Sequence, residues 1–376
     1  MTPAIPFLDL KRQHAQLASE LDAALRGVMS SCDFISGRHA SIFEQSFAEF
    51  CRASHCVGVG NGTDALTVAL RALGIGHGHE VLVPAQTFVA TAEAVTLTGA
   101  RPVFVDVCPD TLTMDPLKAE SSITPATRAL IPVHLYGRPA NMTAFRDLAD
   151  RRGLALVQDC AQAHGASFHD RELASYGDVC CYSFYPGKNL GALGDAGAVV
   201  TNSDTLAKRM RMDANHGRTD KYDHAFEGMN SRLDGFQAAV LSVKLRHLPH
   251  WTARRRELAA RYTSGLSGLD GLALPCGEGL GLHVYHLYVV RSQERDALQA
   301  HLSRQGISTG IHYPTAPPFL RAYAHYGHRP EDFPAAWASQ NEVLSLPLFP
   351  EMTALEQDKV IGAIRDYSAA RRSPVG

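Results

Sequence analysis

The chain lacks the marks of a membrane-spanning, exported or nucleic-acid-binding protein. No apolar run reaches the roughly eighteen residues that a membrane-spanning helix needs. The first residues, MTPAIPFLDLKRQ, have no basic segment ahead of an apolar one, which argues against a signal peptide. With 36 basic and 38 acidic residues the net charge is −2, so there is no excess of positive charge for nucleic acid. We therefore expect a cytoplasmic protein with neither a membrane nor a nucleic-acid partner.

The cysteines lack any Cys-x-x-Cys pair. A zinc site would need Cys51 and Cys56 together with some of the eighteen scattered histidines, and this spacing is not that of a structural zinc site. We interpret all eight as reduced residues, mostly of the core, and expect no metal.

Short apolar runs alternate with helix-period segments from about residue 56 to residue 215. The clearest helix is Asp64 to Leu73, with Leu66, Ala69 and Leu70 on one stripe. The expected strands are Cys56–Val59, Glu80–Val83, Pro102–Asp106, Ala129–Val133, Leu154–Gln158, Val179–Phe184 and Ala198–Thr201. This alternation predicts an α/β fold with a mostly parallel central sheet, whose ligands bind beyond the carboxyl ends of the strands.

A different composition begins near Pro249 and predicts a second, smaller domain. We therefore expect a large domain over residues 1–248, with an amino-terminal arm, and a small C-terminal α/β domain over residues 249–376. The elements expected in the small domain are a helix Trp251–Leu266, a strand His283–Arg291, a helix Glu294–Gln305, a strand Ile307–Tyr313 and a helix Thr353–Tyr367.

The turn Gly60-Asn61-Gly62-Thr63-Asp64 follows the first expected strand and opens directly into a helix. Such a turn offers free backbone N–H groups and the positive end of a helix dipole to a phosphate. A dinucleotide site is a weaker interpretation, because Thr63 stands where the third glycine of Gly-x-Gly-x-x-Gly would be. A plain helix cap without a ligand is the third.

Two further residues extend this phosphate hypothesis. Asp159 follows the buried run LALV at the end of a strand, and either a cation such as a pyridinium or a helix-capping role explains it. Lys188 stands on a Pro-Gly turn ahead of a glycine-rich run, although a lysine near glycines can also be a surface residue. Together they form the set that pyridoxal 5′-phosphate needs: a phosphate anchor, a pyridinium partner and a Schiff-base lysine. Phe88 is placed either to stack on the ring or to pack in the core.

Several long segments resemble those of the DegT/DnrJ/EryC1/StrS family of sugar aminotransferases. The likeness runs from IPFLDL near the amino terminus to LSLPLFPEM near the carboxyl terminus, and the segments follow in the same order as in the family. They are GNGTDAL (60–66), QTFVATAEAV (86–95), QDCAQAHGA (158–166), SFYPGKNLGALGDAGAVVT (183–201), GMNSRLDGFQAAVL (228–241) and IHYP (311–314). One departure from the family pattern, GIGHGHE at 74–80, lies away from the chemistry.

The resemblance implies an aspartate-aminotransferase-like fold of type I and a homodimer with shared active sites. It implies that Lys188 and Asp159 are catalytic, with Lys188 bound to the cofactor and Asp159 paired with its ring nitrogen. The other residues it assigns to the cofactor are Gly62, Thr63, Asp64 and Ser183 at the phosphate, Phe88 on the ring, Gln162 at the phenolic oxygen, and Asn230 at the phosphate of the partner subunit.

The same resemblance is strongest to enzymes that aminate C3 of dTDP-linked 3-keto-6-deoxyhexoses, with glutamate or glutamine as amino donor. It implies that Tyr185, Arg218, His312 and Tyr313 are substrate residues, although Tyr185 can also serve only to pack on the turn and His312 only as a core histidine. The alternatives are 4-keto sugars linked to dTDP or UDP, UDP-linked 3-keto sugars, keto-inositols, and a non-catalytic regulator that binds the cofactor. The lysine at position 188 argues against the dehydratase branch, which has histidine there.

Overall fold

A seven-stranded sheet forms the centre of the larger part of the molecule. The computed structural model describes residues 4–277, 279 and 281–372. The strands lie in the order β1-β9-β8-β5-β4-β2-β3, and β9 alone runs against its neighbours. Their bounds are β1 His55–Val59, β2 Glu80–Pro84, β3 Arg101–Val105, β4 Thr127–Leu130, β5 Ala155–Asp159, β8 Val179–Ser183 and β9 Gly197–Thr201. The expected α/β fold with a mostly parallel sheet is confirmed.

Helices cover both faces of this sheet, and alternate residues of each strand supply the two faces. In β5, Leu156 belongs to one core and Val157 to the other. The first core packs against α2 (Gly37–Phe50), α6 (Met142–Arg152) and the start of α8 (Gly235–Leu266). The second packs against α3 (Gly62–Ala72), α4 (Ala90–Leu97) and α7 (Asp204–Asp213). Burial on both faces explains why the strands are short apolar runs.

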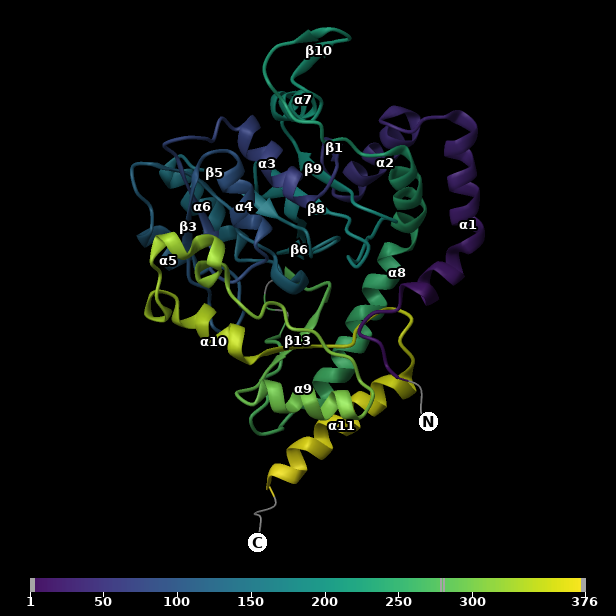
Figure 1. Cartoon of the computed structure of the whole chain (residues 1–376), viewed down its shortest axis with the longest axis vertical. Helices are drawn as coiled ribbons and strands as arrows, with labels where there is room; N and C mark the ends of the chain where they lie inside the picture. The colour runs from purple at the N-terminus through teal and green to yellow at the C-terminus, as the bar shows by residue number, and fades with distance from the viewer. Residues whose placement is uncertain (1–3, 278, 280, 373–376) are drawn as a thin grey trace.

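The C-terminal part lies below the sheet in Figure 1 and has its own core. It contains the two-stranded sheet of β13 (Tyr288–Arg291) and β14 (Val343–Leu346), with helices α9 (Arg295–Arg304), α10 (Pro334–Glu342) and α11 (Ala354–Arg372). The remaining elements are α1 Leu10–Ser31, α5 Pro116–Ser121, the strands β6 Ser167–Phe168, β7 Arg171–Glu172, β10 Arg218–Asp220, β11 Asp223–His224 and β12 Gly281–Leu282, and the short turns of 3-10 helix η1 Leu135–Gly137, η2 Leu173–Ser175, η3 Pro317–Phe319, η4 Arg321–Tyr326 and η5 Pro330–Asp332.

One sequence prediction for this part is wrong, and another is right only in part. The expected strand Ile307–Tyr313 is not continuous: Ile307 pairs with Ile5 and Gly310 with Ser345, each as a single bridge. The strand that pairs with β13 is instead β14, which follows α10 directly. The expected strand His283–Arg291 begins only at Tyr288, because His283 to Leu287 form a loop that crosses to the large part.

Helix α8 runs across the predicted domain boundary at residues 248 and 249. The sequence pattern predicts a start at Trp251, yet the helix begins at Gly235 and keeps Pro249 inside it. In Figure 1 it passes from the sheet region down to α9 and α11, with α1 alongside its upper half. The division into two domains stays a prediction, and its outer ends, residues 1–3 and 373–376, lie outside the described residues. Within 4–277 and 281–372, no helix is long and apolar enough to cross a membrane.

Candidate active site

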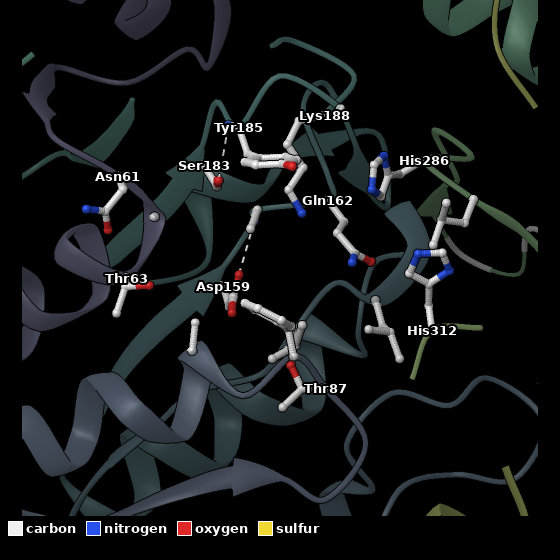
Figure 2. Close-up of a pocket in the computed structure, with 18 of the residues that line it drawn as sticks. Asn61, Thr63, Thr87, Asp159, Gln162, Ser183, Tyr185, Lys188, His286 and His312 are labelled. Carbon is white, nitrogen blue, oxygen red and sulfur yellow. Dashed lines mark hydrogen bonds between the residues drawn. The ribbon is translucent and has the colours of Figure 1, made fainter. Parts of the chain in front are cut away.

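A cavity of about 840 Å³ opens beyond the carboxyl ends of β1, β2, β5 and β8. It brings together residues that are far apart in the sequence, as Figure 2 shows for ten of them. The predicted site residues that line it are Gly62, Thr63, Asp64, Phe88, Asp159, Gln162, Ser183, Tyr185, Lys188, His312 and Tyr313. This is where ligands of open parallel sheets bind.

Lys188 lies on a turn that is closed by two backbone hydrogen bonds. The Lys188 N–H donates to the carbonyl of Tyr185 at 2.8 Å, and the Ala192 N–H donates to that of Phe184 at 2.8 Å. In Figure 2 its amine points into the cavity between Asp159 and Gln162. Burial lowers the pKa of Lys188 from 10.5 to about 8, while the charge of Asp159 opposes this. A fraction of the amine is therefore neutral, and nucleophilic, near physiological pH.

Asp159 is held in one orientation at the base of the cavity. Its Oδ2 accepts a bond from the Thr91 hydroxyl at 2.9 Å, and its Oδ1 accepts one from the Ala161 N–H at 3.1 Å. Burial raises the pKa of Asp159, while these two donors and the charge of Lys188 lower it. The carboxylate thus presents a negative charge to the cavity in a low-dielectric setting.

The start of α3 closes the opposite end of the cavity. The helix approaches β8 so closely that a Cβ on Gly62 would lie 2.6 Å from the Cβ of Ser183. Among the described residues, the backbone N–H groups of Gly62 and Thr63 have no acceptor. The Asp64 N–H, which the family resemblance assigns to the phosphate, here donates to Oδ1 of Asn61 at 2.9 Å and caps the helix.

Gln162 is fixed by two neighbours. Its side-chain carbonyl accepts a bond from the Tyr136 N–H at 2.5 Å, and its amide donates to the Tyr313 hydroxyl at 3.1 Å. The amide nitrogen keeps a second N–H for a ligand. The Tyr136 hydroxyl in turn donates to the His312 carbonyl, so the cavity wall links the large part to the 310–314 segment.

The predicted substrate residues divide into two groups. Tyr185, His312 and Tyr313 line the cavity, with Phe88 and Tyr313 rings 5.4 Å apart. His312 Nδ1 lies 2.8 Å from the Ser345 hydroxyl, and burial lowers its pKa to about 4, helped by Lys188. His312 is therefore neutral at pH 7.

Arg218 and Asn230 do not line this cavity. Arg218 lies in the β10–β11 hairpin at the top of Figure 1, where its guanidinium donates to the carbonyls of Asp220 and Lys221. Asn230 is exposed and bridges Asn215.

Sequence reasoning misses two residues that line the cavity, His286 and Arg255, and one that acts on it only through Asp159. The last is Thr91, which lies within the motif 86–95 from which only Phe88 is selected, so the signal is present. His286 falls in a predicted strand, yet it lies in the preceding loop with Nδ1 3.2 Å from the Asn189 side-chain oxygen. Arg255 lies in a run of three arginines, Arg254 to Arg256, yet it is buried and donates to the backbone carbonyls of Tyr285, His286 and Leu348.

The comparisons with known proteins agree with this geometry. Residues 15–365 match the DegT/DnrJ/EryC1/StrS aminotransferase family. One relative is the dTDP-3-amino-3,4,6-trideoxy-alpha-D-glucose transaminase of Streptomyces venezuelae, 48% identical over 98% of this chain and 97% of its own length.

Solved structures show the same fold. The crystal structure of S. venezuelae DesV in complex with a ketimine intermediate superposes with a TM-score of 0.96, at 48% identity, over 98% of this chain and 99% of its own. The Bacillus subtilis NtdA structure with bound cofactor PMP gives a TM-score of 0.92 at 30% identity, over 98% of this chain and 86% of its own.

Proposed function

The chain belongs to the DegT/DnrJ/EryC1/StrS aminotransferase family, and we propose from this premise that it aminates C3 of a dTDP-linked 3-keto-6-deoxyhexose. The cofactor of the proposed reaction is pyridoxal 5′-phosphate, and the amino donor is glutamate or glutamine. The observation that carries the proposal is a partly buried lysine amine with a lowered pKa, in one cavity with a fixed carboxylate.

The residues present fit this cofactor at three places. The unpaired N–H groups of Gly62 and Thr63 lie at a helix N-terminus, where a phosphate is stabilised, and Ser183 lies beside them. Asp159 offers a negative charge to a protonated ring nitrogen, and the Lys188 amine is free of any ion pair among the described residues. A cradle, a counter-charge and an unpaired amine thus line one cavity.

Pyridoxal phosphate, when bound, supplies an aldehyde for an amine and a ring that withdraws electrons from the bond that breaks. The residues of this chain supply the rest. Lys188 Nζ is placed to take a proton from the α-carbon of the donor amino acid and to return one to the product side. With a pKa of about 8, roughly a tenth of this amine is neutral at pH 7.

The remaining cavity residues bind and orient. Asp159 stabilises positive charge at the base of the cavity. Hydrogen bonds from Thr91 and Ala161 fix the orientation of its carboxylate. The second N–H of the Gln162 amide is available to a ligand oxygen. Neutral His312 and the hydroxyl of Tyr313 can hydrogen-bond sugar hydroxyls without adding charge, and the exposed Tyr185 ring lines the same cavity. This supports a keto sugar as the amino acceptor.

The choice of C3 and of dTDP is supported by the name of the S. venezuelae relative, which is a dTDP-3-amino sugar transaminase. We propose in addition that the active unit is a homodimer. Asn230 and Arg218 lie outside the cavity of their own chain, and the proposed dimer places both at the site of the partner subunit, Asn230 at the phosphate and Arg218 at the nucleotide diphosphate.

The first experiment tests the cofactor. The purified protein should be yellow, and borohydride should fix the chromophore to Lys188, as peptide mass spectrometry would show. Lys188→Ala should lose the covalent attachment. A protein that gains no visible band on addition of pyridoxal phosphate would contradict the proposal.

The second experiment tests the substrate. Glutamate or glutamine is supplied with a panel of dTDP- and UDP-linked 3-keto and 4-keto sugars and keto-inositols, and the products are identified by mass spectrometry and NMR. Amination of the dTDP-linked 3-keto-6-deoxyhexose should be fastest. Faster amination of another class would assign the enzyme to that class, and a visible band without any turnover would favour a regulator.

A further inference from the structure

Lys244 is a fully buried lysine outside the cavity. It lies on α8, its side chain has no solvent exposure, and it is absent from the cavity lining. Its Nζ donates to the Gly191 carbonyl at 2.8 Å and lies 3.1 Å from His14 Nε2 on α1. No described carboxylate lies within ion-pair distance, and Glu351 acts only from further away. A buried ammonium with two neutral partners is costly, so a functional reason is expected.

The Gly191 carbonyl belongs to the end of the turn that carries Lys188, beside the Ala192 N–H that closes this turn on the Phe184 carbonyl. The turn folds back so tightly that a Cβ on Gly191 would lie 2.2 Å from the Pro186 carbonyl oxygen. The side chain of Asn189 ties the middle of the turn to the Val284 carbonyl at 3.2 Å. Lys244 therefore holds the far end of a loop whose start, at Tyr185, accepts the Lys188 N–H.

We propose that Lys244 is a positioning residue for Lys188, acting through the Gly191 carbonyl. Its hydrogen bond holds the turn from the side opposite the cavity. The Lys188 amine therefore keeps its orientation and stays partly desolvated. The proposal rests on the catalytic role of Lys188 proposed above. Helices α8 and α1 then both help to position the reacting amine, because Lys244 lies on α8 and its neighbour His14 lies on α1.

The protonation states of Lys244 and His14 depend on their surroundings. Burial lowers the pKa of Lys244 to about 8, and Glu351 opposes this. Burial also lowers the pKa of His14, and Lys244 adds to the effect, so at neutral pH the pair is an ammonium beside a neutral imidazole. A neutral His14 accepts from Lys244, which leaves the other ammonium protons for Gly191.

Lys244→Met tests the proposal, because it keeps an unbranched, flexible side chain only one bond shorter and removes the donor. In the holoenzyme, kcat should fall about 10- to 100-fold while KM for the keto sugar changes less than about threefold, since a displaced reacting group costs rate rather than binding. The pH midpoint of the visible absorbance should also shift, because Lys188 is then less firmly desolvated. A purely structural role would leave that midpoint unchanged.

The matched control is Arg246→Met. Arg246 lies two residues further on α8, and its guanidinium pairs with Glu20 of α1 at 2.7 Å rather than with the turn. The substitution should lower stability slightly without changing kcat or the midpoint. Equal effects of the two variants would overturn the proposal, as would a Lys244→Met enzyme with wild-type kcat and midpoint.

A second variant covers the case in which Lys244→Met does not fold. Lys244→Gln keeps an N–H donor on a side chain one bond shorter, and its kcat and midpoint should lie between those of the wild type and full loss. A folded Lys244→Gln enzyme whose kcat and midpoint change no less than those of a variant without any donor, Lys244→Leu, would then refute the role of this hydrogen bond. If wild-type protein itself forms no visible band, the proposed function fails first, so the two failures are distinguishable.

Discussion

Lys188 gives the enzyme a pH dependence whose direction follows from its environment. Only the neutral amine can accept a proton, and its pKa of about 8 lies more than two units below the ordinary value of 10.5. At saturating substrates, kcat should therefore rise from pH 6 to about pH 8 and then level off. Steady-state kinetics in buffers of constant ionic strength measure this rise of kcat with pH.

Chemical rescue identifies the group responsible. Lys188→Ala should lose at least about 10²-fold in rate, as expected for loss of an acid–base group. Methylamine should restore part of the rate. The rise of kcat with pH should then occur at higher pH, because a free alkylamine has a pKa near that of an exposed lysine, about 10. A rise that stays near pH 8 in the rescued variant would assign it to another group.

At the scale of single residues, sequence patterns locate Lys188, Asp159 and the Gly62 turn because each follows directly from a strand or glycine turn. The patterns cannot show that the Asp64 N–H is already used by Asn61, since capping depends on a rotamer rather than on spacing. They also miss Arg255 inside the run Arg254 to Arg256, because burial of one helix face is decided by a partner far along the chain, here the Leu348 carbonyl.

The contact between α3 and β8 makes Gly62 sensitive to a single methyl group. Gly62→Ala places its Cβ 2.6 Å from that of Ser183, which must separate the helix N-terminus from the strand end. Overpacking of this kind costs about 1–3 kcal/mol. We expect cofactor affinity to fall by about tenfold or more, measured by fluorescence titration of the apoenzyme.

Gly362→Ala is the control for this substitution. Gly362 lies in α11, and a methyl group there would meet no described atom within 4 Å beyond its own helix backbone. The change should therefore leave cofactor binding unaltered and slightly favour the helix. Unchanged affinity in Gly62→Ala would show that the approach of α3 to β8 does not form the phosphate end of the site.

Helices α1 and α11 are tied by Arg12 and Glu356. The Arg12 guanidinium donates to both Glu356 oxygens, at 2.9 and 2.6 Å, and with the Thr353 donors it lowers the pKa of Glu356 from 4.5 to about 2. A lowered carboxyl pKa contributes stability that is present above pH 4.5 and lost as the pH falls toward 2. The partly exposed pair limits this contribution to about 1 kcal/mol.

Glu356→Gln should therefore destabilise the protein by about 1 kcal/mol at pH 7, and the difference from wild type should shrink below about pH 4.5. Urea unfolding at pH 7, 5 and 4 measures this difference. A constant difference across these pH values would mean that shape rather than charge ties the two helices.

Helices and strands whose apolar residues recur with a clear period can be predicted from sequence. Elements that depend on pairing with distant residues cannot. The seven strands of the large sheet and α9 are predictable because their apolar patterns are local. The segment 307–313 looks like a strand, but its partners are single residues on either side, Ile5 and Ser345, and no local pattern reports this. Proline usually ends a helix, so the pattern divides α8 at Pro249, whereas burial of Leu248 and Trp251 on either side keeps it continuous.

For the whole molecule, the proposed dimer predicts complementation between two inactive variants. If Asn230 serves the partner's site, a heterodimer of Lys188→Ala and Asn230→Ala contains one site with both defects and one intact site. Random pairing of equal amounts should then restore roughly a quarter of wild-type activity. The variants are mixed, dissociated and reassembled, with each variant treated alone as the control. If Asn230 serves its own chain, every mixed site is defective and no activity returns.

Helix α8 also decides where this chain can be divided. A cut at residues 248 and 249 would break one continuous 32-residue helix and leave apolar faces on both pieces, so two fragments made separately at that point should aggregate rather than fold. The β10–β11 hairpin stands clear of the rest in Figure 1 and is mostly exposed, but it is needed if the dimer shares its sites. Because this long helix joins the sheet to the C-terminal part, we expect the two parts to be expressed and engineered best as one chain.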